Sequence, residues 1–273
     1  MNPECSWDFA GKTDRGRVRA NNEDSFLIEE GLGLLIVADG MGGHNSGEVA
    51  SSLAVSTIRD LLAQRLGEGG AAAPEAGEPG LSPRARELEY CVTSANTLIY
   101  EKGRAASNDA GMGTTVVAAL ADERSVCVAH VGDSRLYRLR DGALTQLTED
   151  HSLVGDQLRR GLITPEAAAH SVLQNILTRA LGAEALVKVD VAEHAVLPGD
   201  MLLLATDGLS KMVSDEEVAR VMTQDPDPHH AAETLVERAC AAGGTDNITV
   251  ICGRLVAGRP RGLWRQVSRL FQT

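Results

Sequence analysis

Apolar residues along this chain come in short runs that end at turn residues. Runs of this length, bounded by glycine or aspartate, predict buried β-strands. Residues 135–140 and 143–147 flank Asp141-Gly142, a dipeptide that suits the positive φ angles of a type I′ hairpin turn. The other predicted strands cover residues 34–38, 114–120, 125–131, 201–205 and 247–256.

A different spacing, with apolar residues three and four apart, predicts two long helices. The first begins at Asn45 or Ser46, and the second begins at Ser82, with Pro83 in its first turn. Strands joined by hairpins, together with paired helices, indicate an α+β fold in which helices pack on antiparallel sheet. Shorter helices are predicted for residues 151–161, 164–169, 214–223 and 228–242.

The domain organisation follows from composition. We predict a single domain over residues 1–256, with a flexible surface insertion at 67–82 that is rich in glycine, alanine, glutamate and proline. Residues 257–273 form a basic, amphipathic tail without acidic residues. Two interpretations of this tail stay open: contact with a membrane surface or a partner, or a terminal helix that docks on the acidic body or frays.

The formal net charge of -12 argues against nucleic-acid binding, which usually leaves a basic face. It does not exclude a phosphorylated substrate, because bound divalent cations invert the field of a carboxylate cluster. No secretory signal and no apolar run long enough to cross a bilayer are visible, and the 5 cysteines form no C-x-x-C pair. We therefore expect a cytoplasmic protein, and we expect it to be monomeric.

Acidic residues stand at the ends of several apolar runs, next to glycine or at the start of a loop. Rigid strand ends can bring such carboxylates to one edge of a sheet. A carboxylate cluster with no cationic side chain close in sequence is costly unless it binds a cation, and oxygen ligands favour Mg²⁺, Mn²⁺ or Ca²⁺. The alternative for each position taken alone is an ordinary turn. The positions are Asp39-Gly40, Asp133, Asp207-Gly208 and Asp246.

A charged segment at residues 13–25 adds a second element. The planar fork of Arg19 can hold a phosphate through two hydrogen bonds. Glu23 and Asp24 could hold metal-bound waters. The alternative, which composition alone favours, is a solvated charged loop.

Together these segments resemble the type 2C metal-dependent protein serine/threonine phosphatases, the PPM family, and in particular its bacterial branch. The resemblance covers residues 9–255, and its blocks occur in the family's order. No single block is specific, but their joint occurrence is. The blocks are residues 19–24, 39–44 (Asp-Gly-Met-Gly-Gly-His), 113–115, 131–135 (Val-Gly-Asp-Ser-Arg), 148–152, 206–209 (Thr-Asp-Gly-Leu) and 244–249 (Gly-Thr-Asp-Asn-Ile-Thr).

The resemblance implies a fold and a place for the active site. The family fold is a central sandwich of two antiparallel β-sheets flanked by paired α-helices on both faces, four layers in all. Two metal ions lie at one end of the sandwich. Residues 151–181 resemble the family's flap, which lies beside the active site and influences substrate choice.

The resemblance also implies a role for each matching residue. Arg19 would hold the substrate phosphate. The metal ligands would be Asp39 bridging both ions, the Gly40 carbonyl on one, Asp207 and Asp246 on the other, Asp133 on a third, weaker ion, and Glu23 and Asp24 through bound waters.

The implied reaction is hydrolysis of phosphoserine or phosphothreonine, with two or three Mn²⁺ or Mg²⁺ ions as cofactors. A water bridging two ions would attack phosphorus in line with the leaving oxygen. No serine or cysteine nucleophile is needed, so no covalent phosphoenzyme is expected.

One position departs from the eukaryotic pattern, which carries a proposed histidine general acid directly after the first Asp-Gly. Here that residue is Met41, as is usual in bacterial members. His44 is an alternative acid, although it could simply belong to the start of the helix. For His151 we expect a structural or flap-related role.

Two rival functions stay open. The chain could be a silent family member that binds phosphoproteins, although every expected metal aspartate is present. It could instead act on nucleotides or small phosphates, which the acidic balance disfavours for nucleic acids. The expected partners are phosphorylated proteins, in particular a bacterial serine/threonine kinase and its substrates.

Overall fold

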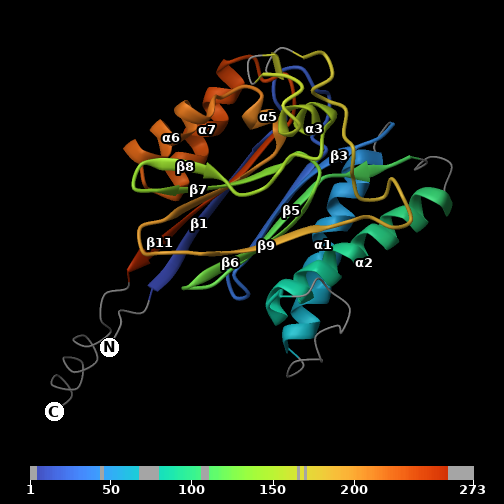
Figure 1. The fold of residues 1–273 in the computed structure, drawn as a ribbon, viewed down its shortest axis with the longest axis horizontal. Coiled ribbons are helices and arrows are strands. Elements are labelled where there is room, and N and C mark those ends of the chain that lie inside the picture. Colours follow the sequence, from blue (N-terminus) through green and yellow to red (C-terminus); the bar gives the residue numbers. More distant parts are fainter. Residues whose placement is uncertain are drawn as a thin grey trace.

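The computed structural model describes residues 5–43, 46–67, 80–105, 111–164, 167–168 and 171–257. Within them, two antiparallel sheets face each other, and helices cover both outer sides (Figure 1). The predicted four-layer α+β sandwich is therefore confirmed.

The first sheet joins the two ends of the described chain. β1 and β11 pair over ten residues, from Cys5 opposite Ala257 to Asp14 opposite Ile248. In sheet order, the strands are β1 (Cys5–Asp14), β11 (Ile248–Ala257), β10 (Met201–Ala205), β7 (Arg135–Arg140) and β8 (Ala143–Gln146).

The second sheet contains the long central strand β3, whose last residues also pair with the short strand β4. In sheet order, the strands are β2 (Asp24–Glu29), β3 (Leu34–Met41), β5 (Val116–Ala121), β6 (Ser125–Val131) and β9 (Asp190–Ala195), with β4 (Gly113–Thr114) beside β3.

Two helix pairs form the outer layers, and two short helices lie near one end of the sandwich (Figure 1). α1 (Ser46–Gly67) and α2 (Pro83–Ala105) cover the second sheet. α6 (Asp215–Gln224) and α7 (Pro228–Ala241) cover the first. The short helices are α3 (Leu153–Arg159) and α5 (Asp207–Ser210).

Burial on both faces explains the unbroken apolar runs. On β3, Leu34 and Ile36 pack against the helices, whereas Leu35 and Val37 pack against the other sheet. β10 alternates in the same way, with Leu203 toward the helices and Leu204 toward the sheet. Residues that follow such strands therefore start from a rigid backbone.

Most of the predicted elements are confirmed. The hairpin turn is present, with φ angles of 51° at Asp141 and 79° at Gly142. The predicted strand over residues 114–120 is wrong as a single element, because Thr115 separates β4 from β5. There the Thr115 backbone N–H donates to the Asp39 carbonyl, at 2.9 Å.

Three strands and one helix were missed. β1, β2 and β9 carry polar residues at many positions, and α5 is a single turn. The predicted helix over 151–161 is shorter than expected, because Ser152 caps it and accepts a hydrogen bond from the Gly155 N–H. Of the predicted helix over 164–169, only residue 164 and the helical residues 167–168 lie in the described ranges.

Several predictions concern residues outside the described ranges. They are most of the insertion at 67–82, the helix start at Asn45, His44, and nearly all of the tail at 257–273. No helix in the described part of the chain has both the length and the apolar character needed to cross a membrane.

Candidate metal centre

Asp39 lies near the end of β3, where its backbone is held on both sides. Its N–H donates to Thr115 Oγ1 at 3.0 Å. Its carbonyl accepts from the Thr115 N–H and from Thr114 Oγ1, both at 2.9 Å. The two threonines therefore fix the backbone from which the Asp39 carboxylate projects.

Glu23 and Asp24 lie beside Asp39 at the start of β2, because Asp24 pairs with Asp39 in the sheet. The Gly40 N–H donates to the Glu23 carbonyl at 3.1 Å. A Cβ on Gly40 would lie 2.1 Å from the Gly47 carbonyl oxygen, so only glycine permits this approach. The sequence thus needs glycine after Asp39 for packing, whatever its carbonyl binds.

Asp207 opens α5 directly after β10, and the preceding Thr206 ties it to two other strands. The Thr206 hydroxyl donates to Asp24 Oδ2 at 2.9 Å, and the Thr206 N–H donates to the Thr249 carbonyl at 3.0 Å. A Cβ on Gly208 would lie 1.9 Å from the Asn247 carbonyl oxygen. The second Asp-Gly therefore also requires glycine for close backbone contact.

Asn247 anchors the N-terminal charged segment. Its Nδ2 donates to the carbonyls of Arg15 and Asn21, at 2.9 and 2.8 Å, and its Oδ1 accepts from the Glu23 N–H at 2.8 Å. The segment is therefore folded onto the site, which disfavours the solvated-loop alternative. No hydrophobic pattern could have shown this role of Asn247, because it depends on carbonyls more than 200 positions away.

These elements converge on one cavity of about 190 Å³. Every predicted site residue except Asp24 lines it. Asn175 and Leu177, from the segment expected to be the flap, line it as well. The predicted residues at the cavity are Arg19, Glu23, Asp39, Gly40, Asp133, Asp207 and Asp246.

Burial dominates the electrostatics of the carboxylates. It raises the pKa of Asp24 and of Asp133 to about 7. The pKa of Asp39 rises well above its usual value, first through burial and then through the charges of Asp24 and Asp207. Such a cluster is costly to ionise without a compensating cation.

Two cationic side chains lie at the carboxylate cluster, and one of them is close in sequence to a carboxylate of the cluster. Lys211 forms an ion pair with Asp207 Oδ2, and Arg19 donates to Asp246 Oδ2 at 2.7 Å. The expectation of no cation close in sequence was wrong, because one helical turn places residues 207 and 211 side by side. Neither cation reaches every carboxylate.

The donor set fits hard divalent cations. Asp24 Oδ1 and Asp207 Oδ1 are buried and have no hydrogen-bond partner among the described residues. Buried oxygens of this kind normally have a partner, and an ion supplies one. All the candidate ligands are oxygens, the choice of Mg²⁺ and Mn²⁺.

A second group with metal-ligand chemistry, His130, His151 and Asp190, lies in contact within the fold. His151 Nδ1 accepts from the Gly132 N–H at 3.1 Å, and its Nε2 lies 3.1 Å from Asp190 Oδ2. Both ring nitrogens are therefore engaged. The buried His151 stacks on His130, which fits the structural role expected of it.

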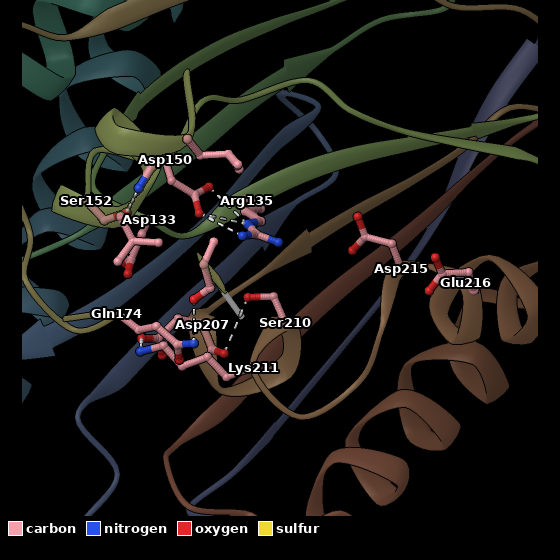
Figure 2. A pocket seen from close by; sticks show the side chains of 14 residues that line it. Asp133, Arg135, Asp150, Ser152, Gln174, Asp207, Ser210, Lys211, Asp215 and Glu216 are labelled. Atoms are coloured by element: carbon pink, nitrogen blue, oxygen red, sulfur yellow. Dashed lines mark hydrogen bonds and ion pairs between the residues drawn. The ribbon is translucent and has the colours of Figure 1, made fainter. Parts of the chain in front are cut away.

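A larger cavity of about 500 Å³ adjoins the metal centre (Figure 2). Asp133, Asp207 and Lys211 line both cavities. The larger one extends past the ion pair of Arg135 and Asp150 toward α6.

Comparisons with known proteins agree with this geometry. Residues 13–238 match the family model described as protein phosphatase 2C. The serine/threonine phosphatase stp of Listeria monocytogenes is 39% identical over 243 residues, which cover 88% of this chain and 92% of that protein.

Solved structures show the same likeness. The serine/threonine phosphatase PstP/Ppp of Mycobacterium tuberculosis is 37% identical and has a TM-score of 0.80, covering 92% of this chain and 99% of that one. A PstP catalytic domain in complex with two manganese ions has a TM-score of 0.78, at 37% identity and the same coverage. The family model, the sequence relative and the solved structures therefore agree on one family. The chain belongs to the protein phosphatase 2C family and is a serine/threonine protein phosphatase of the bacterial type.

Proposed function

We propose that this phosphatase holds two divalent cations at the smaller cavity, which Asp39 lines, and uses them to hydrolyse phosphoserine and phosphothreonine in proteins. One observation carries the proposal: carboxylates from distant parts of the chain meet Arg19 in a single cavity. The manganese ions of PstP, a relative with the same fold, support it.

The resemblance to the family implies which residues would hold the ions. Asp39, the Gly40 carbonyl, Asp207 and Asp246, which line the cavity together, would hold two of them, and Asp133 would help to hold a third, weaker ion. Glu23 and Asp24 would act through bound waters.

When bound, the ions would activate a water for in-line attack on phosphorus and neutralise charge on the phosphoryl oxygens. Arg19 contributes a fixed positive charge and further N–H donors to the phosphate. Thr114 and Thr115 keep Asp39 in place throughout. Oxygens such as Asp207 Oδ1, which has no partner among the described residues, are the ones available to the ions.

The larger cavity supports a protein substrate over a small phosphate. It adjoins the metal centre and is bordered by Val154 and Leu158 of α3, in the segment expected to be the flap. The phosphorylated side chain would enter the smaller cavity while the neighbouring polypeptide lies in the larger one. We further propose that the natural substrates are a bacterial serine/threonine kinase and its targets, met in the cytoplasm by a monomeric enzyme.

The test is phosphate release from a phosphothreonine peptide by metal-stripped protein, with and without Mn²⁺. We expect release only with Mn²⁺, and a kcat/KM for the peptide well above that for p-nitrophenyl phosphate. Asp207→Asn should lower turnover by roughly a hundredfold or more while the fold is kept. Asp8→Asn, at an exposed position of β1, is the matched control. Near-normal turnover in Asp207→Asn would refute the ligand assignment, and no release by folded wild-type protein would favour a silent phosphoprotein-binding role.

A further inference from the structure

Lys211 introduces a fixed positive charge into the metal centre. It follows α5 directly, and its N–H donates to the Asp207 carbonyl at 2.9 Å, so the side chain returns to the face that carries the Asp207 carboxylate. Its Nζ forms an ion pair with Asp207 Oδ2 and donates to Asn175 Oδ1 at 2.6 Å. The ammonium is therefore held from two sides rather than free in solvent.

The two oxygens of Asp207 have different surroundings. Oδ2 is taken by Lys211, whereas Oδ1 is buried and has no hydrogen-bond partner among the described residues. An ion that binds Asp207 through Oδ1 leaves Lys211 in place. An additional ion at the same carboxylate would have to use Oδ2 and displace the ammonium.

Asp133 belongs to the same group of side chains. Asp133, Asp207 and Lys211 line both cavities, and Figure 2 draws all three at the larger one. The charges of Asp207 and Asp133 both act on the Lys211 ammonium.

We propose that the Lys211 ammonium takes the position of a third cation between Asp207 and Asp133, so that the enzyme works with two bound ions. This inference rests on the proposed two-ion site. A divalent ion entering there would face repulsion from the ammonium and would lose half of the carboxylate pair that could hold it. The third site is accordingly weak in this chain because a side chain already supplies the charge.

The experiment counts bound ions rather than turnover. Metal-free wild type, Lys211→Met and the control Lys12→Met are dialysed to equilibrium against Mn²⁺ from about 1 μM to about 5 mM, and bound manganese is measured by elemental analysis. Lys12 is an exposed lysine of β1 that lines neither cavity, so its replacement removes one positive charge outside the site. Circular dichroism confirms that each variant is folded.

We expect two tightly bound ions in wild type and in Lys12→Met. We expect a third ion in Lys211→Met, with its dissociation constant at least tenfold below that of any third ion in wild type. Adding Asp133→Asn to Lys211→Met should abolish the third ion. Lys211→Arg, which keeps the charge, should behave as wild type and gives a second variant if Lys211→Met folds poorly.

The outcomes separate the two proposals. Two ions in both wild type and Lys211→Met, or a third ion that binds equally well to both, would overturn the role of Lys211 alone. No tight binding by any folded variant would overturn the two-ion site and, with it, this inference.

Discussion

Arg19 donates a hydrogen bond of 2.7 Å to Oδ2 of Asp246, a residue 227 positions away. This bond is the main reason that the pKa of Arg19 is raised, and the charges of Asp39 and Glu23 add to it. The side chain is 50% exposed, so its guanidinium is oriented by Asp246 yet open to the cavity. A guanidinium has five N–H donors, and several therefore remain for a phosphate.

The first prediction follows from that geometry. Arg19→Ala should lower kcat/KM for a phosphothreonine peptide by about a hundredfold, because one preorganised charge contact to the phosphoryl group is lost. Arg19→Lys should recover only part of this, since an ammonium cannot contact Asp246 and a phosphate with the same planar fork. Steady-state kinetics at saturating Mn²⁺ measure both variants.

Arg17→Ala is the matched control, because Arg17 is exposed and its backbone N–H donates to the Gly244 carbonyl, a contact that alanine keeps. Its kcat/KM should stay within about twofold of wild type, as is usual for surface substitutions away from a site. A loss in Arg17→Ala equal to that in Arg19→Ala would show that general charge, not the Arg19 contact, matters.

The second prediction concerns pH and metal affinity. In the metal-free protein, burial raises the pKa of Asp24 and Asp133 to about 7 and that of Asp39 well above normal, so these groups hold protons near neutral pH. Mn²⁺ must displace the protons, and its affinity should therefore rise from about pH 5.5 to about pH 7, by up to tenfold per pH unit for each proton displaced. Calorimetric titration in two buffers of different ionisation enthalpy gives the number of protons released.

Asp24→Asn provides the check on this assignment, because burial raises the pKa of Asp24 to about 7. The variant lacks one protonated carboxyl, so the metal-linked proton release at about pH 6 should be smaller than in wild type. If Mn²⁺ affinity were independent of pH across that range, the raised pKa values would be refuted.

The sequence predicted which residues meet at one cavity better than it predicted the strands that carry them. Strand ends with Asp-Gly were visible because both faces of β3 and β10 are buried, which leaves unbroken apolar runs before Asp39 and Asp207. The hydrophobic pattern did not predict β1 and β2, because few of their residues are fully buried. The two strands include the charged residues Asp8, Lys12 and Asp24. Their place is set by partners distant in sequence, which no local pattern contains.

The spacing of residues along the sequence could not predict the contacts between side chains at the site. Asn247 and Thr206 looked like ordinary polar residues beside the motif aspartates, yet they hold Glu23 and Asp24. Lys211 was overlooked because α5 was not predicted, and only a helical turn brings it to Asp207. A search for charged residues four positions after each motif aspartate would have found it.

The third prediction tests the close packing of the second Asp-Gly. Gly208→Ala would place a Cβ 1.9 Å from the Asn247 carbonyl oxygen, so the backbone must shift. We expect the free energy of unfolding to fall by about 2–4 kcal/mol, as for overpacking of backbone in a rigid site, and turnover to fall with it. Gly43→Ala is the control, because nothing lies within 4 Å of a Cβ there. Urea unfolding of the two variants should differ clearly, and equal stabilities would contradict the close approach of Gly208 to the Asn247 carbonyl.

The last prediction concerns the contacts of Asp190 with both ends of the segment expected to be the flap. Asp190 accepts from His151 Nε2 at 3.1 Å and from Arg179 Nη1 at 2.6 Å, and the His151 hydrogen bond is the main reason that the pKa of Asp190 lies well below its usual value. A carboxyl whose pKa is lower in the folded state contributes stability above its unfolded pKa of about 3.9 and loses that contribution as pH falls through the acid range.

Asp190→Asn should therefore lower the free energy of unfolding by about 1–3 kcal/mol at pH 7, and the difference from wild type should shrink as pH falls below about 4. Urea unfolding from about pH 7 to about pH 3 measures this, with Asp8→Asn, exposed on β1, as the control. A difference that stays constant over that whole range would mean that Asp190 stabilises the fold by its shape rather than by its charge.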